Sequence, residues 1–222
     1  MTSPPAPQTS PLHTRFLEAG MRVLARDGYA GFKQSAVCTE TGLTTGAFYH
    51  SFPSWKSFER DLIDYWRRES TERLVDWVES LPSPHGRIDA LIEVALTLPH
   101  RTEAAIRVWA AGTPEVAEAV TQVDDDRTAA VTRAFEEIGI DAQRAARLAG
   151  SSMLMLIGHE ASGGDVALFE WSMRHTLETD PHVIAALAAA DRDSATDQKS
   201  ADDHEGPGPG AAIAGQSASS PE

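Results

Sequence analysis

Residues 33–52 hold the side chains with the clearest chemical use, in the order KQSAVCTETGLTTGAFYHSF. Two short helical patterns flank the turn residue Gly42, which is the arrangement of a helix-turn-helix. The second helix would expose small and hydrogen-bonding side chains, with no acidic group among them. Threonine methyls can contact thymine, and hydroxyls can bind phosphate or base edges. The pattern favours a DNA-reading helix, although an ordinary solvent-exposed helix face remains open from these residues alone.

The candidate DNA contacts are the side chains in and beside these two short helices that packing does not use. Val37, Leu43 and Phe48 are apolar and spaced to hold the two short helices together, with Phe16 and Val23 from the preceding helix. The other side chains face outward, and a lysine near the start of the second and of the fourth helix would contact phosphate. The candidate DNA-binding residues are Lys33, Gln34, Thr44, Thr45, Gly46, Tyr49, His50 and Lys56.

The elements that must position these residues all read as helices. No strand-like alternation and no internal repeat occurs, so the sequence predicts an all-α fold. Glycines, prolines and Ser, Thr or Asp caps mark the helix ends. The predicted helices are residues 12–27, 33–40, 45–50, 54–80, 86–98, 102–111, 114–138, 141–159, 165–178 and 181–190. In the long fourth helix, the residues spaced to line a buried side are Phe58, Leu62, Trp66, Leu74, Trp77 and Val78.

Composition and charge limit the classes of protein. The 222 residues carry a net charge of −14, but residues 1–68 are net +2 and residues 69–222 net −16. The weakly basic N-terminal part and the acidic remainder suggest that only the N-terminal part binds a polyanion, although acidic charge can also serve solubility. The longest uncharged apolar stretch, residues 148–158, is shorter than the ~20 residues of a membrane span. The polar, uncharged start of the chain lacks the regions of a signal peptide, so a cytoplasmic location is expected.

The sequence contains few residues or motifs that would support catalysis or metal binding. Cys38 is the single cysteine, which excludes an internal disulfide and a cysteine-built zinc site, and it reads as a small buried residue. His159, Glu160 and His175 fit no compact metal motif. The acidic run 124–126 would point in different directions on a helix. Glycine-rich phosphate loops, GxSxG and HExxH are absent, so we expect no enzyme activity, no metal and no cofactor.

Residues 17–62 resemble the DNA-binding domain of TetR-type (TetR/AcrR) transcriptional regulators. The matching elements are Asp27-Gly28-Tyr29 at a helix end, the turn Gly42-Leu43-Thr44, Gly46, and the block Phe48-Tyr49-His50-Ser51-Phe52. Residues 107–127 are similar to a motif in one branch of the family's regulatory domains. Three positions depart from the family pattern: Phe32 replaces a helix-capping Thr or Ser, and Thr45 and Trp55 replace lysines. A shallow salt dependence of DNA binding is therefore expected.

The resemblance implies a domain organisation. Residues 12–60 would be a three-helix, helix-turn-helix domain, joined by the long fourth helix to a helical ligand-binding and dimerisation domain, residues 61–190. The ends, residues 1–11 and the acidic tail 191–222, are expected to be disordered because they cannot bury enough apolar surface.

Two further sites are implied by the resemblance. An apolar ligand pocket would lie between the central helices, and its candidate lining residues, which could equally fill a core, are Trp77, Leu91, Val94, Trp109, Phe135 and Met153. The last two main helices would form a four-helix bundle with those of a second copy, although their small-residue stripes would equally serve an internal core. The candidate dimer-interface residues are Ala145, Ala149, Ser152, Leu156, Phe169 and Ser172.

The functional hypothesis is a ligand-responsive transcriptional regulator. It is expected to bind a palindromic double-stranded DNA operator as a homodimeric repressor, with half-sites ~34–36 Å apart, and to be released by a small-molecule inducer. No membrane partner is expected. The alternative is a helical small-molecule-binding or enzymatic protein with a vestigial helix-turn-helix.

Overall fold

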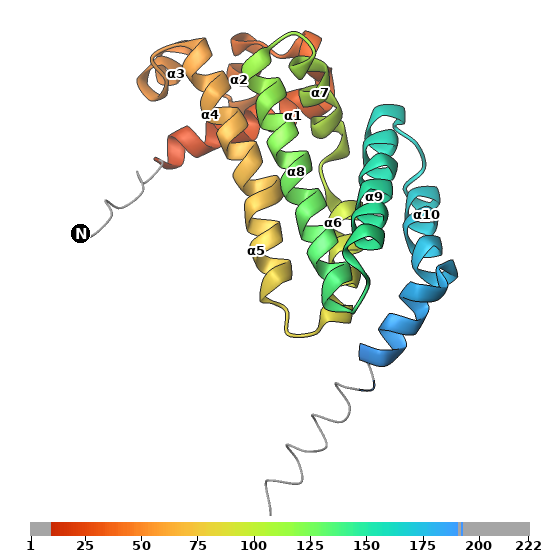
Figure 1. The fold of residues 1–222 in the computed structure, drawn as a ribbon. Coiled ribbons are helices and arrows are strands. Elements are labelled where there is room, and N and C mark those ends of the chain that lie inside the picture. Colours follow the sequence, from red (N-terminus) through yellow and green to blue (C-terminus); the bar gives the residue numbers. More distant parts are fainter. Residues whose placement is uncertain (1–9, 191, 193–222) are drawn as a thin grey trace, which may run out of the picture.

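The computed structural model describes residues 10–190 and residue 192, and the regular elements among them are helices (Figure 1). The predicted all-α fold is confirmed. A small N-terminal unit lies at one end of an elongated helical body. Its elements are α1 (Pro11–Gly31), α2 (Gln34–Thr41) and α3 (Thr45–Ser51). Of the predicted disordered ends, residues 1–9 and the tail apart from Arg192 lie outside the described residues, whereas Ser10 and Pro11 begin α1.

Local sequence signals set the limits of these three helices. Gly28 has a φ of 66° and interrupts α1 where the sequence predicts its end, because a left-handed φ carries no steric cost for glycine. Gly42, with a φ of 68°, ends α2, and its N–H bonds to the carbonyl of Cys38. The hydroxyl of Thr44 accepts from the amide of Ala47 and begins α3.

A single long rod then leads from the N-terminal unit into the body. It consists of α4 (Trp55–Arg67), the π-helical turn η1 (Arg68–Glu72) and α5 (Arg73–Ser80). Ser54 caps it as predicted, because its hydroxyl accepts from the amide of Ser57. Trp66 and Val78 lie on the predicted buried side, but Trp77 does not: 49% of it is exposed. The widened π-turn shifts the register of α5 relative to α4, which a uniform helical period could not predict.

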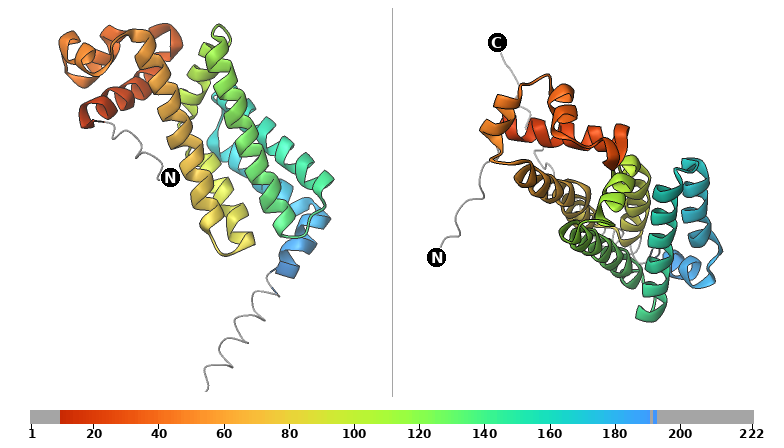
Figure 2. Two further views of the ribbon diagram at one scale, coloured as in Figure 1. Left: turned by 60° about the vertical axis from the view of Figure 1, so that its left-hand side comes forward. Right: turned by 90° about the horizontal axis from the view of Figure 1, so that it is seen from above.

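The body contains the remaining helices, together with a helical segment over residues 181–190. These helices are α6 (Pro84–Thr97), α7 (His100–Ala110), α8 (Pro114–Glu137), α9 (Ala142–Ser162) and α10 (Val166–Thr179). Asp141 and Asp165 cap α9 and α10 by accepting from backbone amides. Helices α9 and α10 lie side by side along the edge of the body farthest from α3 (Figures 1 and 2).

One of the three clusters of the hydrophobic core extends from the N-terminal unit into the adjoining part of the body. The buried residues of α1 and α4 share one cluster with Ile106 and Trp109 of α7 and Val116 of α8. The ring of Trp109 stacks on Tyr29 with centroids 5.5 Å apart and an interplanar angle of 12°. Packing is therefore continuous across residue 60, the predicted limit of the DNA-binding domain.

Candidate nucleic-acid interface

Helix α3 is anchored on one side by aromatic packing. Phe48 is fully buried, and its ring centroid lies 5.4 Å from that of Phe16, edge to face. Phe52 and Phe58 pack on the same ring at 5.2 and 5.3 Å. Aromatic pairs of this kind contribute ~0.5–1.5 kcal/mol beyond their buried area. They fix the rotation of α3, which lies at the outer end of the molecule, away from α5 and α10 (Figure 2).

Most of the candidate DNA-binding residues are exposed, while Gln34 is half-buried. Tyr49, with 52% of its surface exposed, donates its hydroxyl to Gln34 Oε1 at 3.5 Å and so links α3 to the start of α2. Around Gly46 the backbone is open, because an added Cβ would meet only the Thr44 hydroxyl, at 3.7 Å. The exposed candidates are Lys33, Thr44, Thr45, Gly46, Tyr49, His50 and Lys56.

The acidic group of α2 is neutralised within the N-terminal unit. Glu40 accepts from Arg22 Nε at 2.9 Å and from Arg26 Nη1 at 2.5 Å. Hydrogen bonds from these two guanidinium groups lower the pKa of Glu40, so its carboxylate stays ionised and paired. The nearest ion-pair partner of Lys56 is Glu115, at 4.0 Å, and both side chains are largely exposed. Such a pair is weak and leaves Lys56 available to a phosphate.

The two aromatic residues that depart from the family pattern are structural. Phe32 is only 7% exposed, and its ring lies 4.9 Å from Trp55 and 5.3 Å from Trp109. Trp55 also packs on Phe58, with centroids 5.0 Å apart. Both residues therefore fill the cluster that joins the N-terminal unit to α7, and neither presents a cation to DNA.

An apolar cavity lies in the body, enclosed by η1, α5, α6, α8, α9 and α10. Four predicted pocket residues line it: Leu91, Val94, Phe135 and Met153. Two do not. Trp77 points to solvent, and Trp109 is occupied by the aromatic cluster around Tyr29. Sequence reasoning missed Ser70, Thr71 and Arg127, which line the cavity and of which Thr71 and Arg127 are at most 8% exposed.

The predicted dimer-interface residues are mostly inside the subunit. Ala145, Ala149, Leu156 and Phe169 are at most 4% exposed, so they pack within the body and leave almost no surface for a second copy. Ser152 lines the cavity, and Ser172 is half-buried. The small-residue stripe of α9 therefore serves the internal core, which was the other possibility that the sequence left open.

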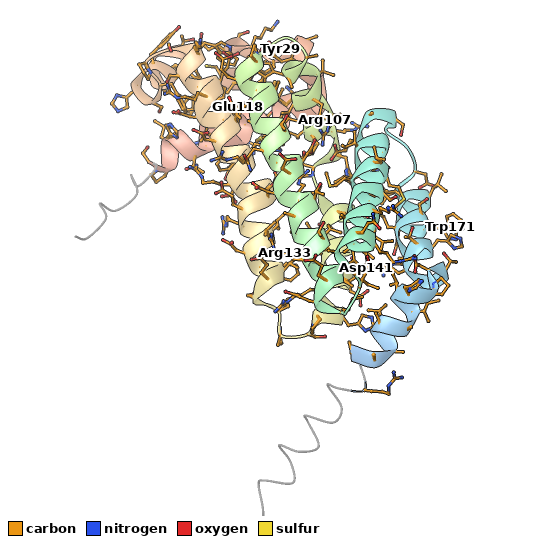
Figure 3. All side chains as sticks on the ribbon, viewed as in Figure 1. Tyr29, Arg107, Glu118, Arg133, Asp141 and Trp171 are labelled. Carbon is orange, nitrogen blue, oxygen red and sulfur yellow. The ribbon has the colours of Figure 1, made fainter. Side chains whose placement is uncertain are left out.

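The exposed apolar residues of α9 and α10 lie on a different side of each helix from the buried residues above. Leu154 is 74% exposed on α9, and Leu168 and Trp171 are 62% and 59% exposed on α10. Trp171 points away from the body and stacks on His175 (Figure 3). Val166 and Ile184 extend the same kind of surface. We call Leu154, Val166, Leu168, Trp171 and Ile184 the outer apolar face.

Cys38 is 8% exposed, and burial raises the pKa of its thiol. This agrees with the interpretation of Cys38 as a small buried residue. Among the described residues, no group of three or more His, Cys, Asp and Glu side chains could hold a metal ion. Within the same part of the chain, no helix has both the length and the apolar character needed to span a membrane.

Comparison with known proteins agrees with this arrangement. Residues 16–56 match the model of the bacterial regulatory proteins of the tetR family. No curated protein is significantly similar to the chain.

Similar solved structures include a TetR-family transcriptional regulator from Streptomyces coelicolor, with a TM-score of 0.63 at 17% identity over 75% of this chain and 92% of that one. A transcriptional regulator from Saccharomonospora viridis, in complex with choline, has a TM-score of 0.61 at 18% identity, over 76% and 96% of the chains. A TetR-family regulator from Agrobacterium tumefaciens has a TM-score of 0.58 at 20% identity, over 75% and 96%. At these identities the likenesses show the fold.

The matched segment contains α2, α3 and the rings of Phe16, Phe48 and Phe52, and 75–76% of the chain shares the fold of the structures above. Residues 16–56 therefore form a helix-turn-helix domain of the tetR family of bacterial regulatory proteins, in a chain that has the fold of TetR-family transcriptional regulators.

Proposed function

We propose that the protein is a homodimeric repressor, held on a palindromic operator by α3 and released by a small-molecule inducer bound in the body. The observation that carries this proposal is the outer side of α3. It exposes hydroxyl, imidazole and glycine positions and no carboxylate, on a helix whose other side is locked by Phe48. This surface suits close approach to a major groove.

The residues divide into two kinds of contact. Thr44, Thr45 and His50, beside the open backbone of Gly46, are proposed to meet base edges, because their groups hydrogen-bond or contact a thymine methyl. Lys33, Lys56 and the Tyr49 hydroxyl are proposed to bind phosphate, and Gln34 is proposed to support Tyr49. With few cations in this set, the electrostatic part of affinity is modest.

Dimerisation is proposed through the outer apolar face. The two exposed leucines and the exposed tryptophan of this face lie on α9 and α10, which are adjacent helices at one edge of the subunit, and large apolar side chains exposed in this number favour burial against a partner. Pairing α9 and α10 with the same helices of a second copy would bury this face in a two-fold, four-helix arrangement. A two-fold dimer also matches the symmetry of a palindromic operator.

Ligand control is proposed to act through the long rod. The cavity wall includes residues of η1 and α5, and the same rod continues as α4 into the DNA-binding unit. A ligand that favours one arrangement of the rod would change the position of α3 by its differential affinity for the two states. The choline complex of the Saccharomonospora viridis regulator supports a ligand-binding role for a body of this fold.

Replacing Thr45 or Tyr49 by alanine is expected to weaken binding to the preferred duplex by at least about 5-fold each, because each change removes a direct contact to base or phosphate. The duplex would first be selected from random-sequence DNA by the unaltered protein. Affinity would then be measured by fluorescence anisotropy at fixed salt.

Thr121→Ala, an exposed threonine of α8, is the matched control and should bind as the unaltered protein does. Unchanged affinity in both α3 variants, or a selection that never enriches any sequence, would show that the helix-turn-helix is vestigial.

Replacing Leu154 by arginine is expected to convert the dimer to a monomer, because a charge buried at the centre of an apolar interface has no partner. Light scattering after size exclusion should give twice the chain mass of 23.9 kDa for the unaltered protein and the chain mass for the variant. Val108→Arg, which changes a 63%-exposed residue of α7, is the control and should stay dimeric. An unaltered protein that is monomeric at micromolar concentration rules out this interface.

A further inference from the structure

The cavity in the body has an apolar wall and one polar end. Its volume is about 80 Å³, counted as space open to the centre of a water molecule. This is room for roughly six water-sized groups, at about 10–15 Å³ each. Leu91, Val94 and Phe135 are among the side chains of the apolar wall, whereas Thr71 and Arg127 mark the polar end beside η1.

Thr71 is the unusual group of this cavity. It is 1% exposed, and its hydroxyl oxygen has no hydrogen-bond partner. Elsewhere in the body, helical threonines donate to the carbonyl four residues back, as Thr97 and Thr128 do at 2.9 and 2.7 Å. An unpaired buried hydroxyl destabilises the folded protein, so its position at a cavity wall calls for a partner.

The π-turn explains why Thr71 has no internal partner. In η1 the chain is wound more widely, and the amide of Arg73 bonds to the carbonyl of Arg68, five residues back. This winding moves the usual acceptor out of reach of the hydroxyl. Two hydroxyls on the α9 and α10 side of the wall do have partners, because Ser152 donates to Leu148 O and Thr176 to Ser172 O.

The charge at the polar end is already balanced. Arg127 is the single charged residue that lines the cavity, and its guanidinium is paired with Glu103 at 3.1 Å. It also donates to the carbonyl of Ser70 at 3.0 Å. A ligand carrying its own charge would leave that charge uncompensated in an apolar space, which is strongly unfavourable. With Phe135 as the single aromatic lining residue, the wall also lacks the aromatic cage that favours a quaternary ammonium.

We propose that the cavity binds an uncharged, mainly apolar molecule with one hydroxyl or carbonyl oxygen, which pairs with the Thr71 hydroxyl while the hydrocarbon part fills the apolar wall. This assignment rests on the proposed ligand-binding role of the body and names the chemical class for it. Since Thr71 belongs to the turn that joins α4 to α5, the ligand's oxygen would act directly on the joint between the cavity and the DNA-binding unit.

The test compares ligands of one length with different head groups. Isothermal titration of the full-length protein with 1-pentanol, pentanoate and pentylammonium, which match the size of the cavity, should show binding of the alcohol and at least about 10-fold weaker binding of both ions. Tighter binding of either ion than of the alcohol overturns the assignment, as does the absence of alcohol binding.

A pair of isosteric variants tests the polar contact. Thr71→Val removes the hydroxyl at nearly constant shape and should weaken 1-pentanol binding by about 3- to 10-fold. It should also raise the thermal midpoint of the ligand-free protein, because an unpaired hydroxyl is lost, so failure to fold is not a concern. Thr176→Val, whose hydroxyl already has a partner, should leave the alcohol affinity within about 2-fold. Equal affinities for the alcohol in the unaltered protein and Thr71→Val refute the contact.

The same preparations would be titrated with the duplex selected from random DNA. Normal DNA binding without any binding of the alcohol counts against the ligand class and leaves the regulator proposal standing. Alcohol binding with no preferred duplex counts against the regulator proposal and leaves the ligand class standing.

Discussion

Replacing Glu103 by alanine is expected to lower the free energy of unfolding by about 3–5 kcal/mol, which is the cost of leaving a buried charge unpaired. Glu103 is 1% exposed on α7. Its carboxylate accepts from Trp66 Nε1 at 2.9 Å and from both terminal nitrogens of Arg127, at 3.1 and 3.3 Å. Alanine would leave the guanidinium of Arg127 and the indole N–H of Trp66 without this acceptor in the core. Urea denaturation followed by circular dichroism measures the loss.

The control for this prediction is Glu118→Ala, an exposed carboxylate of α8 that should change stability by less than about 0.5 kcal/mol (Figure 3). The double variant Glu103→Leu/Arg127→Leu should lose less than the sum of the single changes, because both charges leave together. A Glu103→Ala protein within about 1 kcal/mol of the unaltered one would contradict a structural role for this network.

The contribution of Glu160 to stability is expected to fall by about 2–3 kcal/mol between pH 5 and pH 8. Its side chain is fully buried on α9; Oε2 accepts from Arg107 Nε at 2.9 Å and Oε1 has no partner. Burial, and then the nearby carboxylate of Glu103, raise the pKa of Glu160 from 4.5 to about 7 against the opposing effect of Arg107. The folded state therefore holds a proton that the unfolded state has already lost.

The sign of this effect follows from proton uptake. Below pH 4.5 the carboxyl is protonated in both states. As the pH rises toward 7, the unfolded state ionises first, which lowers the free energy of the unfolded state relative to the folded state. Stability from this group is present at low pH and is lost as the pH passes through its folded pKa. His100 opposes this trend, since burial lowers its pKa and makes folding less favourable below pH 6.5.

Glu160→Gln isolates the effect, because His100, His159, Asp124 and Arg107 stay in place. The difference in unfolding free energy between the unaltered protein and the variant should shrink or reverse as the pH rises from 5 to 8. Urea denaturation at each pH measures it. Parallel pH profiles for the two proteins would show that Glu160 is ionised throughout.

Helix ends were predictable because their causes are local. Gly28, Gly42, Thr44 and Asp141 act through their own backbone conformation or through a hydrogen bond to an amide two or three residues away. The outward side of α3 was predictable for a related reason. Once Phe48 is assigned to the core, the helical period determines which neighbours point away.

The partner of each helix face was not predictable in the same way. Ala145, Ala149 and Phe169 lie on a stripe, as the spacing indicates, but the stripe meets the subunit's own core. Trp109 was assigned to the pocket and instead packs on Tyr29, eighty positions earlier in the chain. A helical period states which residues share a face, and only the tertiary arrangement states what that face contacts.

By itself the sequence determined an all-helical chain, the helix-turn-helix and the side of α3 that faces outward, because these follow from side-chain periodicity and capping within a few residues. Only the tertiary structure decided the π-turn, the pairing of Glu103 with Arg127, the unpaired Thr71 hydroxyl and the location of the outer apolar face. Each of these depends on contacts between residues far apart in the chain, where long-range packing sets the hydrogen-bond partners and the local dielectric.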